Sequence, residues 1–191
     1  MILEGVVTTL TASGELNVAP MGPVVDASME TLLLRPFHTS VTHANLSRSR
    51  QGVLHVTDDV ELIARAAMGK PDPPPKTFPA TAIEGRILED ACRWYAFRVR
   101  EVDDSEPRSR MTAEVVDRGR LRDFFGFNRA KHAVLEAAVL ATRVHMLDAG
   151  FLRDEFARLK VIVDKTSSPR ESAAFDFLRD RVAERMETPS E

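Results

Sequence analysis

The sequence contains a single cysteine, Cys92, among 191 residues. One thiol excludes an intramolecular disulfide framework and any zinc site built from several cysteines. This sparing use of cysteine is typical of a reducing compartment. We expect Cys92 to be an inert packing residue of a strand, because no basic motif surrounds it to activate the thiol.

A strong charge of either sign is also missing, since the formal net charge is −3 and the pI is about 6.0. Without a general basic field the chain is a poor partner for nucleic acid or acidic lipid, and only a local patch would bind an anion. The start of the sequence has no basic leader, and the longest apolar helical stretch, residues 133–144, is interrupted by Glu136 and Arg143. We therefore expect a cytoplasmic protein without a membrane span.

The first part of the chain has the pattern of short strands. Half-apolar, β-branched runs at 2–10 and 15–19 flank Ser13-Gly14, a tight-turn signal, and predict a hairpin. Two short helices are predicted at 41–51 and 59–68. Further strand-like runs occupy residues 29–37, 52–57, 83–90, 92–102 and 110–117. Seven strands without strand-helix alternation indicate an antiparallel barrel.

A proline-rich segment and a change to helical sequence complete the organisation. Five of the eleven prolines fall within residues 69–79, which we expect to form a stiff surface connector. After Gly119 the pattern predicts three helices. The first is long, runs from Asn128 to about residue 147 and is ended by Gly150. The second is amphipathic, and the third begins at the capping box 168–171. We predict an α+β protein with a barrel over residues 1–119 and a helical extension over residues 120–191.

The stretch "RPFHTSVTHANL" at 35–46 gathers polar side chains directly after an apolar strand. If Ser40 or Thr42 caps the following helix, the first-turn N–H groups remain available to an anion, and Arg35 adds a planar cation suited to phosphate. Thr39 and Asn45 offer further donors. An ordinary helix cap beside a surface arginine explains the same residues, and spacing alone supports the two interpretations equally.

A second unusual stretch is "NVAPMGPVV" at 17–25, in which a strand runs into Pro20-Met21-Gly22-Pro23. Two prolines around a glycine are expected to interrupt ladder pairing and to leave a bare backbone edge against which a flat ring can lie. A bulge or barrel corner is the simpler explanation of this stretch taken alone. Together with the polar cluster, it indicates the two ends of one nucleotide-sized ligand.

The chain resembles a known family in "NVAPMGP", "LRPFHTSVTHANL", "VTDDVELIARAA" and "FGFNRAKHAVLEAAVLATR". It is similar to a prokaryotic family known only as domain of unknown function 447, within the FMN-binding split-barrel superfamily of flavin reductases and flavoredoxins. The resemblance covers the whole chain and implies a dimer with FMN at the subunit interface. It implies a phosphate site formed by Arg35, Thr39, Ser40, Thr42 and Asn45, and a flavin ring near Pro20, Met21 and Gly22.

Three further groups of polar residues have both a functional and a structural explanation: the histidines, the acids at 57–59 and the start of the long helix. The five histidines show no tight ligand spacing, so we predict no metal site. Acids in "TDD" at 57–59 are interpreted as a helix cap in preference to a proton-transfer pair. Asn128 and Arg129 begin the long helix together with Lys131, and cations there oppose the helix dipole unless an anion or acidic partner is close. We predict that Asn128 and Arg129 reach the flavin site or its substrate, with solvation of the helix as the alternative.

The expected function is that of an FMN-binding homodimeric flavoprotein, an oxidoreductase of the flavin reductase type in which the flavin carries the chemistry. No residue is nominated as an acid-base catalyst, and the electron donor and small-molecule substrate are left open. The alternatives are a non-catalytic module for FMN storage or assembly, and a barrel that binds no flavin. Genome context of the resembled family implies a link to pterin-dependent one-carbon metabolism.

Overall fold

The computed structural model describes residues 1–187 and divides into two compact units. The barrel unit comprises Met1–Thr57 and Pro73–Phe124, and the helical unit comprises Asp58–Asp72 and the chain from Phe125 onward. The sequence alone predicts one boundary after Gly119. The structure differs in residues 58–72, because the helix in this segment packs on the C-terminal helices. The last four residues of the predicted extension, 188–191, lie outside the described residues.

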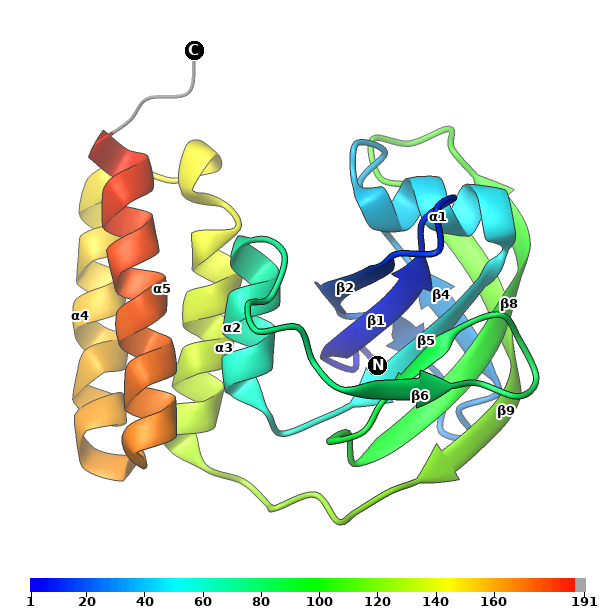
Figure 1. Cartoon of the computed structure of the whole chain (residues 1–191). Helices are drawn as coiled ribbons and strands as arrows, with labels where there is room; N and C mark the ends of the chain where they lie inside the picture. The colour runs from blue at the N-terminus through cyan, green and yellow to red at the C-terminus, as the bar shows by residue number, and fades with distance from the viewer. Residues whose placement is uncertain (188–191) are drawn as a thin grey trace. The chain divides into compact units, whose positions relative to one another are not determined.

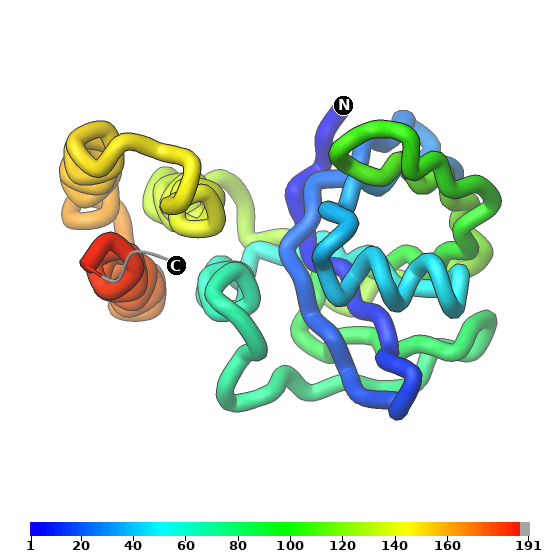
Figure 2. The backbone as a smooth tube through the Cα atoms, turned by 90° about the horizontal axis from the view of Figure 1, so that it is seen from above, coloured from blue at the N-terminus to red at the C-terminus, as the bar shows by residue number. Residues whose placement is uncertain are grey.

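The barrel unit is built on an antiparallel sheet whose curl is visible in Figures 1 and 2. Its strand order is β2-β1-β5-β8-β9-β4-β3. These strands are β1 (Gly5–Leu10), β2 (Leu16–Met21), β3 (Val24–Val25), β4 (Thr31–Leu34), β5 (Gln51–Val56), β8 (Arg93–Asp103) and β9 (Arg110–Arg120). The predicted strand at 83–90 joins a separate pair instead, β6 (Thr77–Pro79) with β7 (Arg86–Leu88). β6 lies in the proline-rich segment, where only a short edge strand is compatible with proline.

A corner at Gly22-Pro23 closes the sheet on itself. Before the corner β2 pairs with β1 as far as Gly5 opposite Met21, and after it β3 pairs with β4. The amide of Leu3 donates to the carbonyl of Pro23, which ties the N-terminal segment to the same corner. The predicted interruption of pairing is therefore wrong for Pro20 and Met21, which lie within the β1–β2 ladder. The barrel-corner interpretation of this stretch is confirmed.

Apolar side chains fill the inside of the curled sheet. Leu32 and Leu34 of β4 meet Leu54 of β5 and Phe97 of β8, and all four are fully buried. Helix α1 (Val41–Ser49) adds Leu46, which is also fully buried and belongs to the same cluster. At roughly 1.5–3 kcal/mol for each buried large apolar side chain, burial of Leu46 in this core stabilises the packing of α1 on the barrel. Cys92 is buried directly before β8 and forms no disulfide, as expected for a packing residue.

The helical unit contains α2 (Val60–Met68), α3 (Arg129–Ala141), α4 (Ala149–Thr166) and α5 (Pro169–Glu187), with a 3₁₀ turn at Val144–Met146. The alanine-rich face of α3 is buried, and α3 packs on α2, α4 and α5. Two predicted features are wrong. The first long helix ends at Ala141, and Gly150 lies in the first turn of α4 behind its cap, Asp148.

The fold class follows from these elements. An α+β chain with an antiparallel barrel sheet and three C-terminal helices is confirmed. Within residues 1–187 no helix combines the length and the apolar character that crossing a bilayer would require.

Candidate functional site

A pocket of about 210 Å³ in the barrel unit brings together the two stretches singled out in the sequence. One wall is the end of β2 and its corner, with Pro20, Met21 and Gly22. The other wall follows β4 and includes Arg35, Ser40 and Thr42. The remaining lining residues are Ala19, Pro36, Phe37 and Arg108. Six of the predicted ligand residues therefore share one pocket, although they come from separate stretches of the chain.

Of the two residues that the sequence offers as the cap of α1, Ser40 and Thr42, the structure has Ser40 as the cap. Its hydroxyl oxygen accepts from the amide of His43 at 3.1 Å, and its hydroxyl donates to the carbonyl of Phe37 at 2.7 Å. Because the hydroxyl proton is committed to Phe37, Ser40 is a poor donor to a ligand. The amides of Val41 and Thr42 precede the first intrahelical bond, and they have no hydrogen-bond acceptor among residues 1–187.

Thr42 is the better hydroxyl donor. Its side chain is buried, with 3% of its surface exposed, and its oxygen accepts from the amide nitrogen Nδ2 of Asn17 at 3.0 Å. Since Asn17 supplies the proton of that bond, the hydroxyl proton of Thr42 is left for a ligand in the pocket. A buried donor held by a neighbour is pre-organised, because little freedom is lost when the ligand binds.

Asn45 lies behind the pocket rather than on its wall. It is 5% exposed, and its Nδ2 donates to Thr9 Oγ1 at 3.0 Å. The same Thr9 oxygen accepts from Asn17 Nδ2 at 3.1 Å, so Asn45, Thr9, Asn17 and Thr42 form one interior network. Asn45 therefore positions Thr9 and, through Asn17, Thr42, and its predicted contact with a ligand stays a prediction. Thr39 is exposed and does not line the pocket.

Two guanidinium groups give the pocket its positive charge. Arg35 is exposed at the pocket and has no hydrogen bond or ion pair with any of residues 1–187. Arg108, from the loop between β8 and β9, lies over the ring of Phe37 at 4.0 Å from the ring centre. Phe37 and Arg108 also form an isolated β-bridge. With hydroxyl and amide donors beside them, these cations suit a phosphate monoester.

Arg108, Asn17 and Thr9 were missed by the sequence reasoning. Arg108 reaches the pocket through a long-range bridge that no local pattern reveals. For Thr9 and Asn17 a signal was present, because the predicted hairpin pairs them directly across β1 and β2. Two polar residues paired across a hairpin, near its turn, can be identified from the sequence as candidates for a buried hydrogen-bond network.

Asn128 and Arg129 belong to the helical unit. Asn128 caps α3 by accepting from the amide of Lys131 at 3.0 Å, and its Nδ2 donates to the carbonyl of Thr166 at 3.0 Å. Both ends of its amide are therefore used inside this unit. Arg129 is exposed and makes no hydrogen bond or ion pair within residues 1–187. Their predicted contact with flavin stays a prediction.

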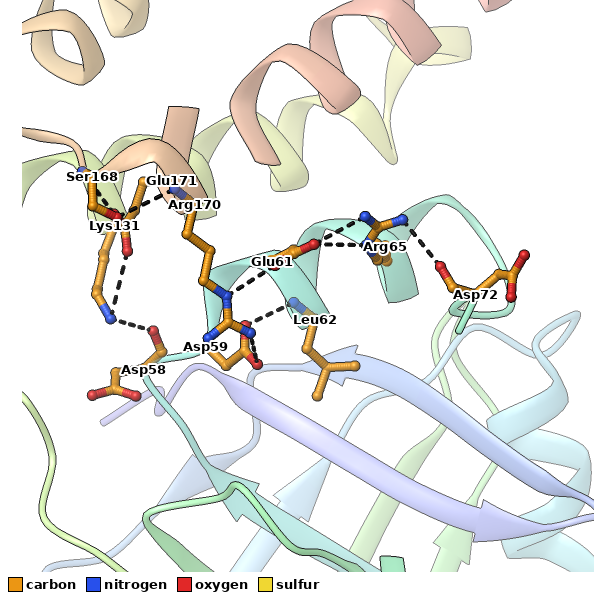
Figure 3. Close-up of polar contacts among 10 residues, drawn as sticks. All are labelled: Asp58, Asp59, Glu61, Leu62, Arg65, Asp72, Lys131, Ser168, Arg170 and Glu171. Carbon is orange, nitrogen blue, oxygen red and sulfur yellow. Dashed lines mark hydrogen bonds and ion pairs between the residues drawn. The ribbon is translucent and has the colours of Figure 1, made fainter. Parts of the chain in front are cut away.

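A polar network within the helical unit explains the neighbouring charges (Figure 3). Lys131 donates to the carbonyl of Asp58 at 2.8 Å and lies 3.8 Å from Glu171, which is the acidic partner that a cation at a helix start requires. Asp59 caps α2 by accepting from Leu62, and Arg170 of α5 bridges Asp59 and Glu61. The hydrogen bond from Arg170 holds the pKa of Glu61 below its usual value. The cap interpretation of "TDD" is confirmed for Asp59.

Two family models match the chain: the N-terminal domain of the protein of unknown function DUF447 over residues 3–122, and the protein of unknown function DUF447 over residues 128–180. The chain belongs to the DUF447 family. The family predicted from the motifs is thereby confirmed. No curated protein matches the sequence of this DUF447 member.

Solved structures share the fold of this DUF447 chain. The FMN-bound protein MM1853 from Methanosarcina mazei superposes with a TM-score of 0.81 at 20% identity, over 94% of each chain. An FMN-binding protein from Thermus thermophilus with bound p-hydroxybenzaldehyde gives 0.54 at 15% identity, over 62% of this chain and 71% of that one. The styrene monooxygenase flavin reductase of Pseudomonas putida S12 gives 0.53 at 14% identity, over 62% and 79%. At these identities the likeness establishes the split-barrel fold.

Proposed function

We propose that this chain is an FMN-binding flavoprotein whose pocket at Arg35 and Thr42 holds the 5′-phosphate. The observation that carries the proposal is the convergence of a free guanidinium, an uncommitted buried hydroxyl proton and two free helix amides on one pocket. These are the donors that a phosphate dianion requires. The fold shared with an FMN-bound relative supports the same ligand.

The flavin ring is proposed to lie against the end of β2. Pro20 and Met21 are on the edge strand of the sheet order, so main-chain groups on the outer side of β2 face away from β1. Bound FMN supplies hydride or electron transfer, and an oxidoreductase of the flavin reductase type is the activity we propose. The chain itself contributes binding, orientation and electrostatics.

A second candidate function is storage or delivery of FMN without turnover. It is favoured by the composition of the pocket, whose lining among the described residues contains no carboxylate, histidine or thiol. Such a pocket has no evident group for moving a proton to or from a substrate. Anaerobic mixing with NADH, NADPH or a reduced pterin, followed by flavin absorbance, separates the candidates: bleaching supports an oxidoreductase, and an unchanged spectrum supports the binder.

Absorbance of the purified protein tests flavin binding itself. We expect a flavin spectrum with FMN released on denaturation, or its appearance after reconstitution of the apoprotein with FMN. A protein that takes up no FMN at concentrations well above micromolar would contradict the proposal and leave the barrel as a scaffold.

Replacing Asn45 by alanine is expected to lower the free energy of unfolding by about 1–3 kcal/mol, because a buried polar network loses one donor. Urea denaturation measures this loss. Thr39→Ala is the matched control, since Thr39 is exposed beside the pocket, and it should change stability by less than about 0.5 kcal/mol. An Asn45→Ala protein of unchanged stability that has lost FMN would contradict the positioning role and would make Asn45 a direct ligand.

We also propose that the protein forms a homodimer. The alanine-rich face of α3 does not support this, because it is covered within the helical unit. Better support comes from Phe125 and Phe127, which are 81% and 94% exposed in the segment before α3. Sedimentation is expected to give twice the chain mass of 21.3 kDa. Phe125→Ser combined with Phe127→Ser should shift the protein toward monomer, and a wild-type monomer with bound flavin at micromolar concentration would contradict the dimer.

A further inference from the structure

Two histidines and an aspartate meet on the barrel unit beside the polar pocket. His38 lies in the loop before α1, His43 in the first turn of α1, and Asp104 in the loop after β8. One ring nitrogen from each histidine and a carboxylate oxygen of Asp104 all lie within 4.8 Å of one another. The histidine spacing alone predicts no metal site. The fold adds a third candidate side chain, Asp104, from a distant loop.

The hydrogen bond of His38 decides which of its nitrogens faces Asp104. Nε2 lies 2.8 Å from the carbonyl oxygen of Glu106, which can only accept, so Nε2 carries the proton. In the neutral ring Nδ1 is then a bare lone pair, and it lies 3.7 Å from Asp104 Oδ1. Two acceptors this close repel each other unless a cation or a donating water lies between them. A histidine whose far nitrogen donates to a backbone carbonyl is the usual arrangement around a bound metal.

The distances from the two histidines to Asp104 are close to those of a coordinated metal. His43 Nε2 is 3.2 Å from the same Asp104 oxygen. Ligand atoms about 2.0–2.1 Å from a tetrahedral Zn²⁺ are about 3.3 Å apart, so the His43–Asp104 pair already fits and the His38–Asp104 pair needs to close by only a few tenths of an ångström. The two rings meet edge to face, with centres 5.0 Å apart, and their ligand nitrogens lie within 4.8 Å of each other.

We propose that His38 Nδ1, His43 Nε2 and the Asp104 carboxylate bind a divalent transition metal of the Zn²⁺ class. Two imidazoles and one carboxylate suit such an ion, and three protein ligands leave further positions for water or an exogenous ligand. The side chain of His43 is 14% exposed, whereas His38 and Asp104 are 35% and 47% exposed, so the site is open to solvent on one side. This proposal is independent of flavin binding.

The test is Zn²⁺ titration of tag-free, metal-stripped protein against a chromophoric chelator, with Co²⁺ absorbance as a second readout. We expect one Zn²⁺ per chain and a visible Co²⁺ d–d band. His43→Gln and Asp104→Asn should each weaken Zn²⁺ at least about a hundredfold and remove the band, since losing a ligand costs more than losing a ligand's hydrogen-bond partner. His145→Gln, which removes an exposed histidine in the helical unit, is the matched control and should bind as wild type.

Thermal melting shows whether each variant is folded. If a variant is unfolded, the Zn²⁺ titration of the wild-type protein still tests the proposal. Wild-type protein that binds no Zn²⁺, or that binds it equally after His43→Gln and Asp104→Asn, would overturn the proposal. FMN reconstitution of the wild type without Zn²⁺ is scored separately, so failure of one proposal is distinguishable from failure of the other.

Discussion

Arg35→Ala is expected to weaken FMN binding by roughly ten- to a hundredfold while leaving riboflavin affinity nearly unchanged. A hydrogen bond to a charged group contributes roughly 1.5–3 kcal/mol, and each ~1.4 kcal/mol is a factor of ten in affinity. Arg35 has no partner within residues 1–187, so its removal breaks no internal interaction that would complicate the result. The two flavins differ only in the 5′-phosphate, and quenching of flavin fluorescence on titration measures both affinities.

Matched variants sharpen the experiment. Arg93→Ala removes an exposed arginine of the same unit that does not line the pocket, and it should bind both flavins as wild type does. Thr42→Val keeps the shape of the side chain but removes the hydroxyl proton, so FMN should again lose more affinity than riboflavin. Equal losses for both flavins in Arg35→Ala, or no loss for FMN, would mean that residues 35–46 form a helix cap and no phosphate site.

Local sequence is sufficient to predict turns and helix caps, because the residues that form them are close together in the chain. The hairpin at Ser13-Gly14, the capping box at Ser168 and the cap at Asp59 each depend on residues a few positions apart, and all three are present in the structure. The pocket was anticipated because its two walls are short continuous stretches, 19–22 and 35–42, that each depart from ordinary strand sequence.

What the sequence missed depends on contacts between distant segments. Arg108 enters the pocket, and Asp104 approaches His38 and His43, only because the β8–β9 loop folds back beside the start of α1. The end of α3 at Ala141 was missed for a different reason. The apolar pattern continues through Val144, but Thr142 ends the helix with its hydroxyl donating to the carbonyl of Val139. A side chain that competes for a helical carbonyl is not visible in hydrophobic periodicity.

His55 of β5 is expected to make the protein lose stability in mild acid. The ring is fully buried; Nδ1 lies 3.2 Å from the carbonyl oxygen of Val6, and Nε2 accepts from the amide of Leu88 at 3.0 Å. Both nitrogens are satisfied only in the neutral ring that is protonated on Nδ1. Burial lowers the pKa of His55 from 6.5 to about 4. A second proton would break the bond to Leu88 and leave a buried charge.

The sign of the effect follows from which state takes up the proton. Below about pH 6.5 the unfolded chain protonates His55, whereas the folded protein does so only near pH 4, so stability falls as the pH drops through this window. The loss is on the order of 3 kcal/mol at pH 4 relative to pH 7, at 1.36 kcal/mol for each unit of pKa.

Because carboxyl groups also titrate near pH 4, the measurement is a difference between variants. In urea denaturation, His55→Gln should be less stable than wild type at pH 7, and the gap should narrow by about 3 kcal/mol as the pH falls to 4. His145→Gln should stay parallel to wild type throughout, and parallel curves for His55→Gln as well would show that His55 is not kept neutral by the fold.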